Sequence, residues 1–167
     1  SVATGIPPLR WAQQFDTVSV CFSKGLGAPV GSALAGPKEL IAEALRHRKV
    51  LGGGMRQAGV LAAAALYALE HHIDRLAEDH ANAGRLAEGI ANIPGLKLAW
   101  DSFPTNLVFF YVDACCGTAA ELAARLREQG VLVLPDGPHT IRMATHLDVS
   151  AADVETALAL LARVVRK

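Results

Sequence analysis

The sequence carries few of the features that mark a membrane-bound, secreted or polyanion-binding protein. Its apolar runs are interrupted well before the roughly 20 residues that a membrane-spanning helix requires, and no signal-peptide pattern opens it. Lys plus Arg and Asp plus Glu number 16 each, so no net charge favours nucleic acid or an anionic membrane surface. These absences predict a soluble cytoplasmic protein that binds neither nucleic acid nor membrane.

Cysteine is also scarce, and histidine lacks the spacing of a metal site. Cys21, Cys115 and Cys116 form no CxxC pattern, and their odd number predicts free thiols in a reducing compartment. We expect the adjacent Cys115 and Cys116 to project differently and to suit neither a strain-free disulfide nor a metal pair. None of the six histidines forms an HExxH pattern. The sequence therefore predicts no metal site.

The apolar content, 51% of 167 residues, is ample for a buried core and is arranged in alternating strand and helix patterns. We expect antiparallel strands over residues 17–22 and 31–36, followed by a helix that begins at Pro37 and ends at the glycines 52–54. Helical spacing then continues to about Pro94, as one helix or as two with a bend at His71 and His72. From Leu96 onward the pattern predicts a small α+β unit, whose last helix begins at a Ser150–Asp153 cap.

Lys24 closes an apolar strand and opens a glycine-rich turn, "SKGLG". Burial in a cleft would lower the pKa of its ammonium group, and the neutral amine condenses with an aldehyde to form a Schiff base. The alternative is a lysine at a strand end that extends its amine into water beside an ordinary hairpin turn. The residues at this point leave both interpretations open.

Two arginines and a second lysine are candidate anion ligands. Arg142 lies between Ile141 and Met143 in an expected strand, so its side chain faces either solvent or a cleft, where it could hold a carboxylate in bidentate fashion. Arg56 precedes a long expected helix, whose N-terminal N–H groups and dipole favour an anion; the alternative is an ordinary helix-start residue paired with an acid. Lys49 lies close enough in sequence to assist.

Two segments carry a resemblance to a known family: "SKGLGAPVGS" at residues 23–32 and "LGGGMRQAG" at residues 51–59. Both resemble the low-specificity threonine aldolases, which are pyridoxal-phosphate (PLP) enzymes of the aspartate-aminotransferase fold, fold type I. The resemblance implies an α/β fold of which this chain is the C-terminal part. Residues 1–57 would be the edge of the large PLP-binding domain, residues 58–95 a linking helical segment, and residues 96–167 the small α+β domain.

The resemblance also implies residue roles and an activity. Lys24 would carry the PLP, Arg142 would bind the substrate carboxylate, and Arg56 with Lys49 would contact cofactor or substrate anions near a subunit interface. The implied reaction is the retro-aldol cleavage of L-threonine, L-allo-threonine and related β-hydroxy-α-amino acids to glycine and an aldehyde, by a homodimer or homotetramer.

The chain has no initiator methionine, and the family places its phosphate-binding glycines, its ring-stacking histidine and its pyridine-binding aspartate before the position where this chain begins. We therefore expect a missing N-terminal half and no activity in the fragment alone. Other interpretations remain: another fold-type-I enzyme, such as a β-eliminating lyase or an aminotransferase, or a non-catalytic structural module that dimerises through its alanine-rich helix.

Overall fold

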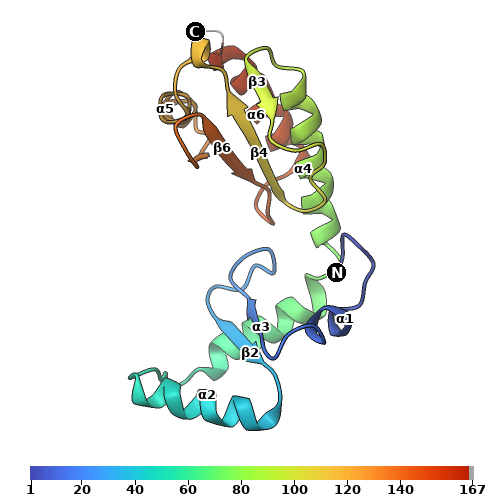
Figure 1. Cartoon of the computed structure of the whole chain (residues 1–167), viewed down its shortest axis with the longest axis vertical. Helices are drawn as coiled ribbons and strands as arrows, with labels where there is room; N and C mark the ends of the chain where they lie inside the picture. Colours follow the sequence, from blue (N-terminus) through green and yellow to red (C-terminus); the bar gives the residue numbers. More distant parts are fainter. Residues whose placement is uncertain (166–167) are drawn as a thin grey trace. The chain divides into compact units, whose positions relative to one another are not determined.

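The computed structural model describes residues 1–165, and the chain divides into two units. The first unit is Ser1–Leu76, coloured blue to green in Figure 1, and the second begins at Ala77. Over the described residues, no helix is long and apolar enough to cross a membrane. The expected division at residues 57 and 95 stays a prediction.

The first unit is a two-stranded sheet with three helices (Figure 1). The two strands are antiparallel, as predicted, with Val18 paired to Ala35 and Cys21 paired to Ser32. All of the residues in these strands are exposed except the half-buried Val18, because neither face of the hairpin is covered within this unit. The elements are α1 (Pro8–Ala12), β1 (Val18–Cys21), β2 (Ser32–Ala35), α2 (Lys38–Val50) and α3 (Gly59–His71).

Helix α2 ends at the glycines, as the sequence predicted, through two closing hydrogen bonds. Gly53 N–H donates to the Arg48 carbonyl at 2.7 Å, and Gly52 N–H donates to the Lys49 carbonyl at 3.1 Å. This is the Schellman arrangement, which requires a left-handed residue directly after the helix, and Gly52 supplies it with φ 82°. A Cβ on Gly53 would lie 2.7 Å from Arg48 Cγ. Both positions therefore favour glycine.

The long helical stretch forms two helices, α3 and α4 (Leu76–Ala91), separated at residues 72–75. Of the two forms that the sequence left open, the structure thus has the interrupted one, and the interruption begins directly after His71. His72 is the C-cap residue of α3, with φ −110° and ψ −4°.

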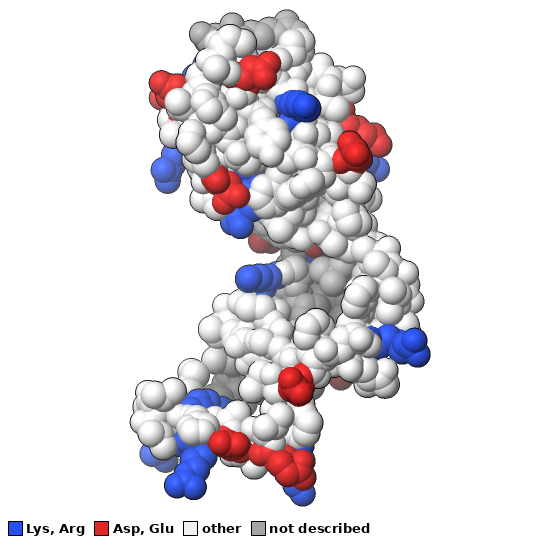
Figure 2. All heavy atoms as spheres, in the orientation of Figure 1, with Lys and Arg blue, Asp and Glu red and all other residues white. Residues whose placement is uncertain are grey.

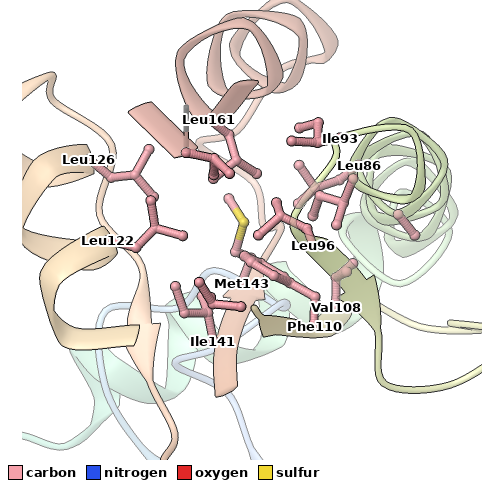
Figure 3. Close-up of a cluster of buried hydrophobic side chains, with 14 of the residues drawn as sticks. Leu86, Ile93, Leu96, Val108, Phe110, Leu122, Leu126, Ile141, Met143 and Leu161 are labelled. Carbon is pink, nitrogen blue, oxygen red and sulfur yellow. The ribbon is translucent and has the colours of Figure 1, made fainter. Parts of the chain in front are cut away.

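The second unit packs three helices against an antiparallel sheet of strand order β3-β4-β6-β5 (Figure 1). Alternate residues of the two central strands, Val108 and Phe110 in one and Ile141 and Met143 in the other, are buried. They form one cluster with side chains from all three helices, such as Leu122 of α5 (Figure 3). The elements after α4 are β3 (Leu96–Leu98), β4 (Leu107–Val112), the 3₁₀ turn η1 (Ala114–Cys116), α5 (Ala119–Glu128), β5 (Leu134–Pro135), β6 (Thr140–Ala144) and α6 (Ala151–Val165).

Side-chain caps define the starts of α5 and α6. The expected cap of α6 is confirmed: the Asp153 carboxylate accepts hydrogen bonds from the Ser150 N–H at 2.9 Å and hydroxyl at 2.6 Å, and Asp153 N–H donates back to the hydroxyl at 3.2 Å. Helix α5 begins with a capping box that was not predicted, in which Thr118 and Glu121 cap each other reciprocally. Within the apolar residues 131–135, only Leu134 and Pro135 form a strand, which is β5. Because β5 lies at the edge of the sheet, it tolerates a proline.

Candidate active site

Lys24 lies in a tight turn between β1 and β2. Its carbonyl accepts a hydrogen bond from Gly27 N–H at 2.8 Å, which closes the four-residue turn 24–27, and Gly27 has φ 71°. A second bond, from Ala28 N–H to the Phe22 carbonyl at 2.9 Å, closes the base of the loop. The backbone that carries the lysine is thus held on both sides of the turn.

Apolar contacts fasten the residues that follow Lys24 to helix α3. Leu26 and Ala28 are buried and form a small cluster with Ala68 of α3, against which Phe22 and Leu76 pack. Lys24 itself is exposed. Of the two interpretations that the sequence left open, the first unit by itself shows the exposed amine, because Leu26 and Ala28 fill the contact with α3 and leave Lys24 outside it. We name residues 22–28 the lysine turn.

A histidine forms a further bond to the lysine turn. His72 Nδ1 lies 2.6 Å from the Leu26 carbonyl oxygen. Because a carbonyl oxygen only accepts, the proton is on Nδ1. No local pattern in the sequence indicates this role, because the two residues are 46 positions apart.

The candidate anion ligands of the first unit flank the glycine segment that joins α2 to α3. Lys49 belongs to the last turn of α2, and its Nζ lies 3.4 Å from the position that a Cβ on Gly54 would occupy. Arg56 is exposed in the turn before α3, whose N-cap residue, Ala58, provides no side-chain cap. Figure 2 shows basic side chains gathered where the C-terminal end of α2 lies. A helix N-terminus without a side-chain cap favours an anion, and Arg56 precedes this one by two residues in the sequence.

Arg142 belongs to the second unit, in the middle of β6. It is paired with Phe109 of β4 on one side and with Leu134 of β5 on the other. Because its neighbours Ile141 and Met143 point into the core, Arg142 lies on the opposite face of the sheet, where it is half-buried. Arg142 is thus outside the core of this unit, and both alternatives that the sequence left open, solvent and a cleft, are compatible with this position.

The cysteines are free thiols, and Cys115 and Cys116 project differently, as expected: Cys115 is exposed, whereas Cys116 is half-buried and packs against the core of the second unit. Their Sγ atoms lie 3.8 Å apart in η1. Burial, together with the neighbouring Cys115, raises the pKa of the Cys116 thiol. Over residues 1–165 there is no group of three or more His, Cys, Asp or Glu side chains that could hold a metal ion.

Comparison with solved structures identifies the class of fold. A protein of Exiguobacterium sp. 255-15, assigned to the aromatic amino acid beta-eliminating lyases and threonine aldolases, matches 98% of this chain and 49% of its own length, with a TM-score of 0.77 at 20% identity. A mutant of the cystine C–S lyase C-DES, solved with glycine covalently linked to its PLP cofactor, matches 63% of this chain and 28% of its own length, with a TM-score of 0.52 at 27% identity. The α/β fold of the PLP-dependent fold-type-I enzymes is thereby confirmed.

The sequence then identifies the family. Residues 1–115 match the family model described as beta-eliminating lyase, and the chain belongs to that family. The low-specificity L-threonine aldolase 1 of Arabidopsis thaliana is 41% identical over 159 residues, which are 95% of this chain and 44% of that protein. The resemblance to threonine aldolases is confirmed, and the chain spans about half the length of the curated relatives that it matches.

Proposed function

We propose that this chain is part of a PLP-dependent aldehyde-lyase of the threonine aldolase type, which cleaves L-threonine, L-allo-threonine and related β-hydroxy-α-amino acids to glycine and an aldehyde. The observation that carries the proposal is the exposed Lys24, presented by a turn whose backbone is closed by two hydrogen bonds and fastened to α3. The 41% identity to a low-specificity L-threonine aldolase supports the substrate class.

The residues of the first unit fit PLP. Lys24 offers an exposed primary amine for a covalent link to an aldehyde, and its neutral form is the one that reacts. Arg56 and Lys49 would contact an anionic group of the cofactor or substrate beside the uncapped start of α3. When bound, PLP supplies the electron sink that allows the bond between Cα and Cβ of the amino acid to break.

Arg142 would hold the substrate carboxylate. A guanidinium binds a carboxylate through two parallel hydrogen bonds, which fix its orientation as well as its position. A fixed carboxylate restricts rotation of the amino acid, and this rotation selects which bond at Cα breaks. The half-buried position on the open face of the sheet supports this role, since it places the side chain among Phe109 and Leu134 instead of in the core.

We propose further that activity requires the rest of a longer protein, assembled as a homodimer or homotetramer in the cytoplasm. The chain accounts for under half of the length of the relatives named as threonine aldolases. The division into a large-domain part at residues 1–57, a linking segment at residues 58–95 and a small domain at residues 96–167 is part of this proposal. On its own, the chain is expected to be inactive.

The test uses the full-length protein loaded with PLP. Borohydride reduction followed by peptide mapping is expected to place the stable pyridoxyl label on Lys24, and L-threonine is expected to yield acetaldehyde and glycine. Lys24→Ala is expected to abolish both, whereas Lys38→Ala, an equally exposed lysine at the start of α2, is expected to keep both. A label on another lysine would contradict the site.

The remaining outcomes separate the other interpretations. A labelled Lys24 with formation of a 2-keto acid, and no aldehyde, would indicate an aminotransferase. Release of pyruvate or ammonia from a β-substituted amino acid, again without aldehyde, would indicate a β-eliminating lyase. Absence of label on the full-length protein would favour a non-catalytic module.

A further inference from the structure

His72 contacts the lysine turn at the peptide group between Leu26 and Gly27. The Leu26 carbonyl of this group accepts the proton of His72 Nδ1 at 2.6 Å, and the Gly27 N–H of the same group donates to the Lys24 carbonyl at 2.8 Å. Carbonyl and N–H point in opposite directions from one planar peptide unit. His72 therefore binds the carbonyl of a peptide unit whose N–H group binds the backbone of Lys24.

One bond within the turn holds this peptide plane, and an external partner gives it a second. Gly27 has φ 71°, in the left-handed region, and glycine adopts several alternative backbone conformations at nearly equal energy. A rotation of the peptide plane would break both hydrogen bonds together. The packing of Leu26 and Ala28 on α3 fixes the side chains of the turn, but it does not specify which way the Leu26 carbonyl points.

His72 is itself well placed to hold the carbonyl. It is the C-cap residue of α3 and is half-buried, and its ring meets the Tyr67 ring edge-on at 5.5 Å. The aromatic contact limits rotation of the imidazole, so that Nδ1 remains directed at Leu26. The preceding His71 lies against Tyr67 at 4.3 Å, and within residues 1–165 the histidine that bonds to the lysine turn is His72.

We propose that His72 is a positioning residue for Lys24: its Nδ1–H holds the Leu26–Gly27 peptide and thereby fixes the lysine turn in the conformation that presents the amine. The catalytic consequence of this inference rests on the proposed function, whereas the hydrogen bond from His72 is independent of that function. His72 does not touch substrate or cofactor in this role. It acts through the backbone of the turn.

Substitutions of His72 distinguish the loss of its hydrogen-bond donor from the loss of its side-chain volume. Asn carries a donor nitrogen on the same branch as His Nδ1, so that His72→Asn keeps the bond, whereas His72→Leu keeps the volume and loses the donor. His71→Leu is the matched control on the neighbouring position. All measurements use the full-length protein, and circular dichroism establishes that each variant is folded.

Two readouts do not depend on activity. Nitrogen-15 NMR of the wild-type protein is expected to show His72 in the tautomer protonated at Nδ1. Hydrogen exchange of the Gly27 amide without PLP is expected to be about tenfold faster in His72→Leu, as for the loss of one hydrogen bond, and unchanged in His72→Asn and His71→Leu. An Nε2-protonated tautomer, or equal exchange in all variants, would overturn the inference.

The catalytic consequence is read from kcat and from the rate at which PLP becomes reducible by borohydride at Lys24. Both are expected to fall about tenfold in His72→Leu with KM nearly unchanged, and to recover in His72→Asn. Equal rates in wild type and His72→Leu would overturn the positioning role. If instead the wild-type protein takes no label at Lys24, the proposed function fails, while the exchange and tautomer results still decide whether His72 holds the turn.

Discussion

Lys24 combines an exposed side chain with a fixed backbone. The side chain is exposed, but Leu26 and Ala28 pack on Ala68 and the turn is closed by hydrogen bonds from Gly27 and Ala28. An exposed lysine on a mobile loop would lose conformational entropy on each encounter with an aldehyde. A fixed turn leaves only the side chain itself to be ordered.

Arg142 provides a test at the scale of one residue, in the full-length enzyme. Arg142→Lys keeps the charge but removes the bidentate geometry, so we expect the KM for L-threonine to rise about tenfold or more. Steady-state kinetics measure the effect, with Arg127→Lys on the exposed surface of α5 as the control. An unchanged KM would show that Arg142 does not hold the carboxylate.

The ends of the helices are set by local chemistry at the scale of one element. Helix α2 ends through the left-handed Gly52 and the closely packed Gly53, and α5 and α6 begin with reciprocal caps. Each of these devices satisfies backbone groups that a helix end leaves without a partner. The end of α2 also fixes where the glycine segment between Lys49 and Arg56 begins.

Gly53→Ala tests the end of α2. The added Cβ would lie 2.7 Å from Arg48 Cγ and 2.9 Å from the Arg48 carbonyl oxygen, so the helix end must shift. We expect the free energy of unfolding to fall by about 1–3 kcal/mol, as for other overpacked sites. Gly59→Ala, where a Cβ meets nothing within 4 Å, is expected to be neutral or slightly stabilising in the same denaturant titration.

The cap of α5 predicts a pH dependence. Hydrogen bonds from the Thr118 N–H and hydroxyl hold the pKa of Glu121 below its ordinary value of 4.5. A lowered folded pKa adds stability above the unfolded value, and this stability is lost as the pH falls through the folded value. We therefore expect Glu121→Gln to be less stable than wild type at neutral pH, with the difference disappearing in acid.

Chemical denaturation of the full-length protein between neutral and acid pH measures this difference. Glu128→Gln changes the same charge at the last residue of α5 and is the control, with no loss of the N-terminal cap. A difference between wild type and Glu121→Gln that stays constant down to the lowest pH would contradict the assigned cause.

At the scale of the whole molecule, the two units differ in how they are stabilised. The second unit has one continuous core drawn from its helices and from alternate residues of its strands (Figure 3). The described core of the first unit is much smaller, with Leu26, Ala28 and Ala68 as its buried members. Its hairpin is almost wholly exposed, and a two-stranded hairpin is marginally stable in water. The first unit is thus the one whose stability is expected to depend on the rest of the longer protein.

Phe110→Ala tests the core of the second unit. Phe110 is fully buried at the centre of β4, so its truncation leaves a cavity, and we expect a loss of about 3–5 kcal/mol in the free energy of unfolding. Tyr111→Ala, on the exposed face of the same strand, is the control and is expected to cost much less. Similar losses for both variants would show that the second unit is not organised around this core.

Features that depend on neighbours in the chain were predictable from the sequence. The hairpin follows from alternating residues and closely spaced glycines, the end of α2 from residues 52–54, and the cap of α6 from Ser150 and Asp153. The family resemblance also came from two continuous segments. The hairpin, the helix end and the cap each depend on backbone propensities or hydrogen bonds that span a few residues, and such local interactions can be predicted from the order of residues in the sequence.

Features that depend on distant residues needed the folded chain. The exposure of Lys24 follows from which side chains of the turn pack on α3, and the bond from His72 to Leu26 joins residues 46 positions apart. The approach of the sulfur atoms of Cys115 and Cys116 depends on the 3₁₀ turn that carries them. Local patterns thus specify where the helices and strands begin and end. Burial and long-range hydrogen bonds arise only when those elements pack, because both depend on which residues are neighbours in space, and the order of residues in the sequence does not show this.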